Sequence, residues 1–387
     1  MTEASIRTQS YARRMVRRTF SRLSARVGLA WIGVLACFAI FSPFLANSRP
    51  LLLSENGKIS SPVLATLGVQ DVVILAAFFA LLILWRLKFS GGKKLLLLLA
   101  VIAISSVLGT SLLNPPRLTI YEQYREQAAS GQYDWVIFPP IPYSPRDYLR
   151  DQGETGLLAP SREHWLGTEE NGADVFSRMI HASRIALGIG FVATGIALFI
   201  GVIIGGLMGY FSGIADIIGM RLVEIFEAVP TLFLLLTFVA FFGRSLYIMM
   251  VIIGITSWPG YARYVRAEFL KLRQQDYVQA AVASGLPLRS ILFRHMLPNG
   301  VAPVLVGASF GVASAILAEA TLSFLGLGLV DAPSWGQMLN QAVRSSTFNW
   351  WMAAFPGGAI FLTVLAYNLM GDALRDAIDP HLSTAAD

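Results

Sequence analysis

The most constraining feature of this sequence is a series of long apolar stretches that carry almost no charged side chains. Each is close to the roughly 20 residues that a helix needs to cross the hydrocarbon core of a bilayer. Eight such stretches lie at 28–46, 71–87, 94–113, 185–210, 222–243, 246–262, 299–328 and 353–371. Only 14% of the residues are charged, against about 25% in ordinary soluble domains. We therefore predict an all-α polytopic membrane protein with about eight transmembrane helices.

Basic residues lie beside the apolar stretches. The formal net charge is +6, and residues 1–26 hold seven Arg and one Glu. Lys and Arg that flank spans orient a chain with its positive side in the cytoplasm. The positive charge therefore predicts contact with membrane lipid and no nucleic-acid partner. The first stretch is long enough to span, and no small-residue cleavage site follows it. We therefore expect a retained anchor after a basic cytoplasmic N-terminus, residues 1–27.

Three loops predict the same topology. The loop between the second and third stretches carries four basic residues and no acidic one. Residues 262–298 hold six basic and two acidic residues, so 6 − 2 = +4, whereas residues 114–184 hold seven and ten, so 7 − 10 = −3. The first two loops are expected inside and the third outside, with both termini cytoplasmic.

The chain divides into four expected parts. The basic N-terminus is followed by an anchor span and a transmembrane hairpin, 28–113, and then by an extracytoplasmic segment, 114–184. That segment is rich in Pro and aromatic residues, and we expect short helices and turns in it. Residues 185–380 form the main transmembrane core, which contains a cytoplasmic loop at 263–298.

No metal, disulfide or nucleotide site is predicted. Cys37 lies alone in the first apolar stretch, and the four histidines are scattered, so neither a disulfide nor zinc-ligand spacing is present. A P-loop needs Gly, four residues and then Gly-Lys-Ser/Thr. The nearest approach, 91–94, lacks both the first Gly and the Ser/Thr. We expect this chain to bind no cofactor and to draw any energy from a partner.

Four glycines recur at intervals of four residues in the fourth apolar stretch and just beyond it: Gly201, Gly205, Gly209 and Gly213. That spacing places them on one face of a helix, where two backbones can approach closely in lipid. Packing within this chain and packing against a partner subunit are both compatible with the pattern.

Residues 276–298 predict a compact helix–turn–helix that projects from the membrane. Small side chains at 280, 281, 283 and 284 are compatible with a helix. Gly285 can end that helix in a left-handed conformation, and Pro287 suits the first turn of a second short helix. We expect Pro298 to break the chain before the next span. A surface of small side chains is typical of a docking element, although an ordinary amphipathic loop at headgroup level would fit the same residues.

An acidic residue, Glu319, interrupts the seventh apolar stretch. Ionisable side chains inside membranes are rare and often functional. Glu319 is therefore a candidate for a pathway or gate, and the alternative is a structural carboxylate that is hydrogen-bonded to a neighbouring helix. Glu224 and Glu227 lie near the inner end of the fifth stretch and are expected to be helix-end charges.

The 276–298 stretch resembles the coupling motif of ABC importer permeases. In that motif Glu-Ala-Ala is followed by Gly four positions after the second Ala, and later by Leu-Pro. Ala280-Ala281, Gly285 and Leu297-Pro298 occupy those places, whereas Gln279 stands at the Glu position. The resemblance implies that this stretch contacts an ATPase. The implied coupling residues are Asp276, Tyr277, Gln279, Ala280, Ala281, Ser284, Gly285, Arg289, Arg294, His295 and Pro298.

Further motifs are similar to the dipeptide and oligopeptide class of these permeases. They are His164–Thr168 with Asp174, the run Leu322–Gly328, and Asp372–Asp376 with Asp379-Pro380. The class usually has Gly-Arg-Asp where this chain has Gly172-Ala173-Asp174. Residues 47–52 and 138–145 look more specifically like the permease of microcin C-type peptide importers. The hairpin within 71–113 has no counterpart in the six-span pattern of the wider class and reads as an insertion.

The resemblance implies a permease subunit of an ATP-driven importer in a bacterial inner membrane, with peptides or peptide-like solutes as cargo. Its implied partners are a second permease subunit, two ABC ATPase subunits that bind ATP and Mg²⁺, and an extracytoplasmic solute-binding protein. Two other classes stay open. An ion-driven secondary transporter would show repeated halves and broken helices, and a non-transporting scaffold would also use a docking element. The sequence does not identify the solute.

Overall fold

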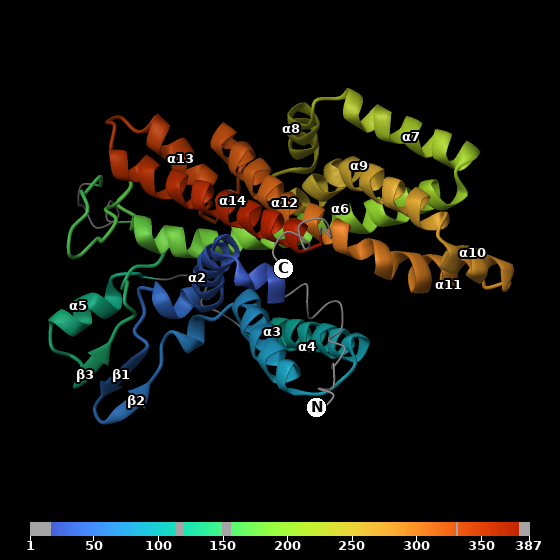
Figure 1. Ribbon diagram of the computed structural model, residues 1–387. Helices are drawn as coiled ribbons and strands as arrows, with labels where there is room; N and C mark the ends of the chain where they lie inside the picture. Colours follow the sequence, from blue (N-terminus) through green and yellow to red (C-terminus); the bar gives the residue numbers. More distant parts are fainter. Residues whose placement is uncertain (1–16, 114–119, 149–155, 330–331, 379–387) are drawn as a thin grey trace, which may run out of the picture. The chain divides into compact units, whose positions relative to one another are not determined.

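The structure is a computed structural model that describes residues 17–113, 120–148, 156–329 and 332–378. The chain forms two compact units, each assembled from separated segments (Figure 1). The first unit contains 1–33, 186–331 and 357–387, and the second contains 34–185 and 332–356. The helices α2 (Leu23–Leu45), α6 (Val175–Phe211) and α14 (Trp350–Ile378) each contribute residues to both.

The second unit contains a small antiparallel sheet that the sequence did not predict. Its strands are β1 (Leu52–Glu55), β2 (Lys58–Ser60) and β3 (Trp135–Ile137), in the order β2-β1-β3. Leu53 of β1 lies opposite Ser60 and Val136. The turn between β1 and β2 uses positive φ at Asn56 and Gly57, as a tight hairpin requires. The segment that we expected outside thus contributes one strand besides its short helix α5 (Gln123–Ala129).

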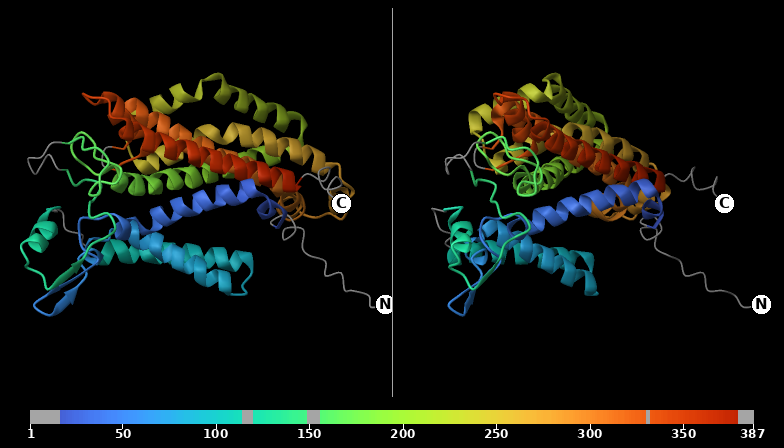
Figure 2. Two further views of the ribbon diagram at one scale, coloured as in Figure 1. Left: turned by 60° about the vertical axis from the view of Figure 1, so that its left-hand side comes forward. Right: turned by 90° about the vertical axis from the view of Figure 1, so that its left-hand side faces the viewer.

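Two long apolar helices of the second unit, α3 (Val69–Arg86) and α4 (Gly91–Leu112), form a helical hairpin (Figure 2). They occupy the places expected for the second and third spans. The absence of a side chain at Gly109 lets α4 approach Val69, because an added Cβ would lie 3.1 Å from the Val69 side chain. The short helices η1 (Leu64–Thr66) and α13 (Trp335–Arg344) belong to the same unit.

The first unit is entirely helical in its described residues. Along the chain it contains α7 (Gly213–Ala228), α8 (Thr231–Phe242), α9 (Leu246–Arg273), α10 (Asp276–Ala283) and α11 (Leu288–Ser290). A π-helical turn at Ile291–Met296 then leads into α12 (Leu297–Leu322), and a second one follows at Ser323–Leu327. One apolar core joins α6, α7 and α9 through Met208, Val223, Trp258 and Ala262.

The all-α membrane class is confirmed, with fewer spans than the eight expected. Among the described residues, six helices are long and apolar enough to cross a membrane, or seven if one bent pair counts as a span. That pair is α7 and α8, which meet at 79°, so the stretch 222–243 is not one straight helix. Pro230 precedes α8, and the residue before a proline avoids helical geometry. The stretch 246–262 lies in α9. The second half of α9 is polar, and α9 is not one of the six helices that are long and apolar enough to cross a membrane.

Candidate functional site

Residues 276–296 form a compact projection, hereafter the knob, at the end of α9 (Figure 1). The helix α10 ends at Ala283, and Gly285, two residues further on, has a φ of +70° in the left-handed region. The Leu286 N–H donates to Ala281 O at 3.2 Å, and the Gly285 N–H donates to Val282 O at 2.9 Å. These two bonds make a Schellman cap. The predicted role of Gly285 in ending the first helix is therefore confirmed.

The second half of the knob runs into α12 without the break that we expected at Pro298. Helical structure continues from Leu288 to Leu322, so this prediction is wrong. Pro298 has no N–H to donate and its ring crowds the carbonyl four residues earlier. The π-helical turn at 291–296 directly precedes it, and this wider turn accommodates the missing bond. Pro287 is the residue just before α11, close to its expected place in the first turn.

The knob packs on an apolar core that it shares with α9 and α12. Val278 and Ala281 of α10 belong to one buried cluster with Phe269 of α9 and with Ile291 and Met296 of the π-helical turn. Ala281 is only 6% exposed. We expected its small side chain on a docking surface, and that expectation is wrong, because Ala281 faces the chain's own core. The neighbouring Ala280 is exposed.

Gln279 ties the knob to α9. Its side-chain amide donates to the carbonyl oxygen of Arg273 at 2.8 Å, and Arg273 is the last residue of α9. The final carbonyls of a helix lack partners within the helix. An ionised carboxylate has no hydrogen to donate, so a Glu at this position could not make the same bond.

The remaining predicted coupling residues lie mostly on the outer face of the knob. Asp276, Tyr277, Ser284, Arg289 and Arg294 are exposed, whereas His295 is partly buried and its ring Nδ1 lies 3.0 Å from Ser290 O. Partial burial raises the pKa of the Tyr277 hydroxyl, and a hydrogen bond to Asn299 opposes that shift. The same face exposes four large apolar side chains, Val282, Leu286, Leu288 and Phe293. This mixed apolar and basic face is suited to protein contact.

Two basic residues join α9 to α7 and to the turn that precedes it. Arg266 forms a two-pronged ion pair with Asp216 of α7, and Arg273 donates to Ser212 Oγ at 2.6 Å. Ser212 has a φ of +52° and lies in the turn between α6 and α7. These arginines entered our sequence analysis only through the loop charge count, because partners some 50 residues away leave no local spacing signal.

Three of the four spaced glycines pack α6 against α9. A Cβ added at Gly201 would lie 2.5 Å from the Tyr261 Cβ, one at Gly209 would lie 2.6 Å from the Phe269 Cβ, and one at Gly205 would strike the backbone carbonyl of Ala262. The interpretation as packing within this chain is therefore correct for these three. Gly213 differs, because it lies beyond the end of α6 with a φ of +55° and open space around it.

Glu319 is 2% exposed near the end of α12. Its Oε1 accepts a hydrogen bond from Ser323 Oγ at 2.6 Å. Ser323 is one turn further along the same helical segment, which bends where Gly326 adopts a φ of +84°. The choice between a pathway role and a structural role stays a prediction.

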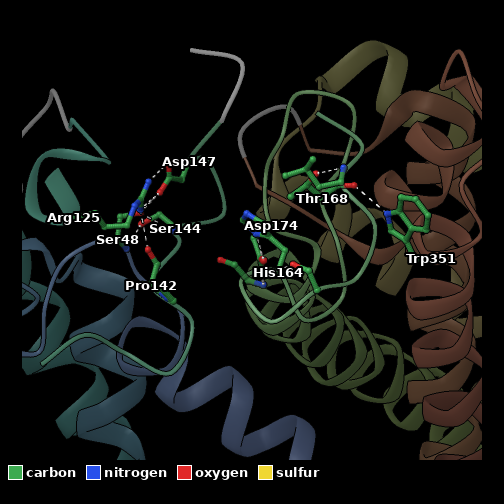
Figure 3. A network of polar contacts seen from close by, with 12 residues as sticks. Ser48, Arg125, Pro142, Ser144, Asp147, His164, Thr168, Asp174 and Trp351 are labelled. Carbon is green, nitrogen blue, oxygen red and sulfur yellow. Dashed lines mark hydrogen bonds and ion pairs between the residues drawn. The ribbon is translucent and has the colours of Figure 1, made fainter. Parts of the chain in front are cut away.

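A second set of polar contacts surrounds the start of α6 (Figure 3). Asp174 Oδ2 lies 2.9 Å from His164 Nδ1, and Asp174 Oδ1 accepts from the Ser177 backbone N–H at 2.7 Å. Asp174 thus caps α6 and holds the motif 164–168 beside it. The Trp351 indole donates to Thr168 O at 3.1 Å. The motif therefore has a structural role at the start of the long helix.

The position at which the class usually has Arg is buried in this chain. Ala173, which occupies it, has no exposed surface. A buried Arg178 lies close by in sequence, within 3.8 Å of Glu169, and donates to Gln341 Oε1 at 3.0 Å. It places a positive charge near the start of α6.

The two motifs at 47–52 and 138–145 meet in a reciprocal clasp (Figure 3). The Ser48 N–H donates to Ser144 Oγ at 3.0 Å, and the Ser144 N–H donates to Ser48 Oγ at 2.7 Å. Ser48 Oγ also donates to Asp147 Oδ2 at 2.6 Å, and Arg125 pairs with the same carboxylate. The guanidinium of Arg125 lies 4.8 Å from the Tyr143 ring centre. We call Ser48, Ser144, Asp147 and Arg125 the serine clasp.

These features define a multi-pass helical membrane protein with a knob packed on its long helices. Residues 201–384 match the family described as binding-protein-dependent transport system inner membrane component. The dipeptide transport permease DppC of Alkalihalophilus pseudofirmus is 38% identical over 250 residues, covering 64% of this chain and 82% of that protein. The glutathione transport permease GsiD of Pectobacterium atrosepticum is 41% identical, covering 63% and 81%. The oligopeptide transport permease OppC of Bacillus subtilis is 38% identical, covering 64% and 81%.

The chain therefore belongs to the family of binding-protein-dependent inner-membrane transport components. It is a multi-pass membrane protein and an importer permease subunit.

Proposed function

We propose that the cargo is a peptide or a peptide-like solute. The relatives that support this are named for dipeptide, glutathione and oligopeptide transport. The two motifs at 47–52 and 138–145, which the serine clasp joins, resemble those of the narrower microcin C-type group within that class, and we propose that group. A bacterial strain that lacks this subunit should resist microcin C and regain sensitivity when the chain is restored. Restoration of dipeptide uptake without restoration of microcin C sensitivity would exclude the narrower group.

We propose further that two separate ATPase subunits bind ATP and Mg²⁺ and dock on the knob, and that this chain binds no cofactor. A second permease and an extracytoplasmic binding protein complete the assembly. The observation that carries the proposal is the Schellman cap at Gly285, which presents an exposed face above a packed core. A loop at headgroup level would need no such core.

The knob has a direct mechanical connection to the far end of α12. Helical structure from Leu288 to Leu322 is continuous, and at 1.5 Å per residue it is roughly 50 Å long. Glu319 lies near its other end. Movement of the knob on ATP binding would thus be transmitted along this helical segment to Glu319. ATP binding would in this way shift the chain between two conformations.

The coupling proposal is tested with a single cysteine at Ser284 in a Cys37→Ala background. When Gly285 is unchanged, this cysteine should crosslink to the ATPase that copurifies with the chain. Gly285→Val should abolish the crosslink and the uptake, because left-handed φ costs a side chain with a Cβ roughly 1 kcal/mol or more. Gly285→Asn is the matched control, since Asn tolerates that conformation. Native uptake by Gly285→Val would exclude the knob as the coupling element. Uptake that persists without any ATPase would favour an ion-driven transporter.

Glu319→Gln separates a pathway role from a structural one. A pathway role predicts reduced transport with normal assembly and basal ATPase activity, because the amide keeps an acceptor for Ser323 but removes the charge. Failure of the complex to assemble would assign Glu319 to structure.

The proposed orientation places the knob and both termini in the cytoplasm and residues 120–148 outside. Single cysteines at the exposed positions Ser130 and Gln275 report on it. An impermeant thiol reagent added to cells should label only the first. Labelling of Gln275 from outside would reverse the orientation.

A further inference from the structure

A pocket of about 500 Å³ lies in the second unit where the end of α2, the start of α3 and the start of α6 meet the segment around Ser144. Its volume is within the range of about 300–1,000 Å³ typical of small-ligand sites. Most of its lining comes from outside the residues 201–384 that match the family. None of the features described so far accounts for it.

The charges around this pocket favour an anion. Three arginines line it, against one acidic residue, Asp71. That carboxylate is already engaged, since it forms an ion pair with Arg184 and accepts from the Gly68 N–H at 2.7 Å. Arg49 and Arg146 form no ion pair with any residue that the structure describes.

Arg49, Arg146 and Tyr121 all line this pocket. Burial raises the pKa of the Tyr121 hydroxyl; the positive charges of Arg146 and Arg49 oppose that rise, whereas Asp147 and Tyr148 add to it. Two guanidinium groups beside a tyrosine hydroxyl can donate several hydrogen bonds to one phosphate, and Arg is well suited to bidentate contact with phosphate oxygens.

The helices that lead from the pocket favour a lipid as the source of that phosphate. Within the most apolar windows of α3 and α4, only 11% and 6% are buried inside the protein. Side chains such as Phe79, Ile83 and Leu96 are more than half exposed. The pocket lies at the end of this hairpin, at the level where headgroups meet water if the hairpin spans the bilayer.

We propose that this pocket binds the phosphate headgroup of an anionic membrane phospholipid, held by Arg49 and Arg146, with its acyl chains along the α3–α4 hairpin. The hairpin, which is absent from the six-span pattern, would thereby supply a lipid site beside the serine clasp. This proposal does not depend on the identity of the transported solute.

The test uses the purified full chain in detergent, with lipid retention read by native mass spectrometry and thermal stability read in parallel. The probes are dimyristoyl phosphatidylglycerol, dimyristoyl phosphatidylcholine and inorganic phosphate. Phosphatidylglycerol should be retained and raise the midpoint of unfolding, and the other two should have a much smaller effect. The double variant Arg49→Gln/Arg146→Gln should bind phosphatidylglycerol at least about tenfold more weakly, whereas replacing both residues with Lys should restore part of the binding.

The matched control is Lys58→Gln/Arg162→Gln, which removes the same charge from two exposed residues outside the pocket. It should retain phosphatidylglycerol like the wild type. Equal loss in both double variants would overturn the proposal, because it would indicate a general charge effect. Equal stabilisation by phosphate alone or by phosphatidylcholine would also overturn it, by indicating a free-anion site or nonspecific solubilisation. Unaltered binding of phosphatidylglycerol by the Arg49→Gln/Arg146→Gln variant would also overturn the proposal.

Discussion

The side-chain amide of Gln279 donates to the backbone carbonyl of Arg273, 2.8 Å away, across the junction between α10 and α9. This bond joins the knob to the last residue of α9, in addition to the apolar packing of Val278 and Ala281 on Phe269. In the motif that this stretch resembles, a Glu stands at that place. Gln279 therefore contacts Arg273 by donating a hydrogen bond, which an ionised carboxylate could not do.

We predict that Gln279→Glu loosens the junction. It removes a hydrogen bond worth roughly 0.5–1.5 kcal/mol and places a negative charge near the negative end of the α9 dipole. Hydrogen exchange of the backbone amides of 276–283 should become several-fold faster. Gln275→Glu is the control, since it adds the same charge at the start of α10, where negative charge is favourable. Faster exchange in both variants would show that charge alone is responsible.

The two neighbouring alanines of the knob should respond differently to Asp. Ala281→Asp places a charge in the cluster with Val278 and Met296, at a cost of about 3 kcal/mol or more, so membrane levels should fall. Ala280→Asp changes an exposed position, so levels should stay normal and only ATPase docking should weaken. Quantitative immunoblots of membranes, with copurification of the ATPase, separate the two effects. Normal levels of Ala281→Asp would contradict the buried position of Ala281.

Gly205→Ala should destabilise the contact between α6 and α9. The new methyl group meets the Ala262 carbonyl, and backbone gives way less readily than a flexible side chain. Overpacking of this kind costs about 1–3 kcal/mol. Gly195→Ala in the same helix has open space around it, and better helix propensity should leave stability unchanged or raise it by up to about 1 kcal/mol. Thermal unfolding of the two variants in one detergent provides the comparison. A lower midpoint for Gly195→Ala than for Gly205→Ala would contradict the packing.

The small sheet should open in acid. Asp134 accepts from the Gly57 N–H at 3.0 Å and from Ser54 Oγ at 2.9 Å, and these bonds lower the pKa of its carboxyl. A lowered folded-state pKa means that the stabilisation is present above the ordinary Asp value and is lost as pH falls through the folded value. Limited proteolysis at the β1–β2 turn should be slow from pH 7 to pH 5 and faster near pH 3. Asp134→Asn should be cleaved faster throughout, and identical acid sensitivity in this variant would exclude Asp134 as the cause.

Local signals in the sequence were sufficient for several elements. The role of Gly285 followed from its position after a run of small helix-compatible residues, and the spacing of Gly201, Gly205 and Gly209 indicated a packing face. Such features depend on residues within one or two turns of each other, so a single sequence contains them.

Other features depend on partners that are distant in the sequence, and these were missed or misread. Ala281 was expected on the surface because nothing nearby indicates that Phe269 and Met296 cover it. The pairing of Arg266 with Asp216 spans 50 residues. Pro298 was misread for a different reason, since proline usually breaks a helix, and a π-helical turn is a rare alternative that residue type alone does not predict.

The serine clasp can form only after both of its serines have been synthesised. Ser48 and Ser144 are 96 residues apart, and at about 5–20 residues per second the ribosome needs roughly 5–20 s to make the chain between them. During that interval Ser48 has none of its hydrogen bonds to Ser144 or Asp147, while the residues of α3 and α4 are already made. The contact at the end of α2 therefore forms after both helices of the hairpin have been synthesised.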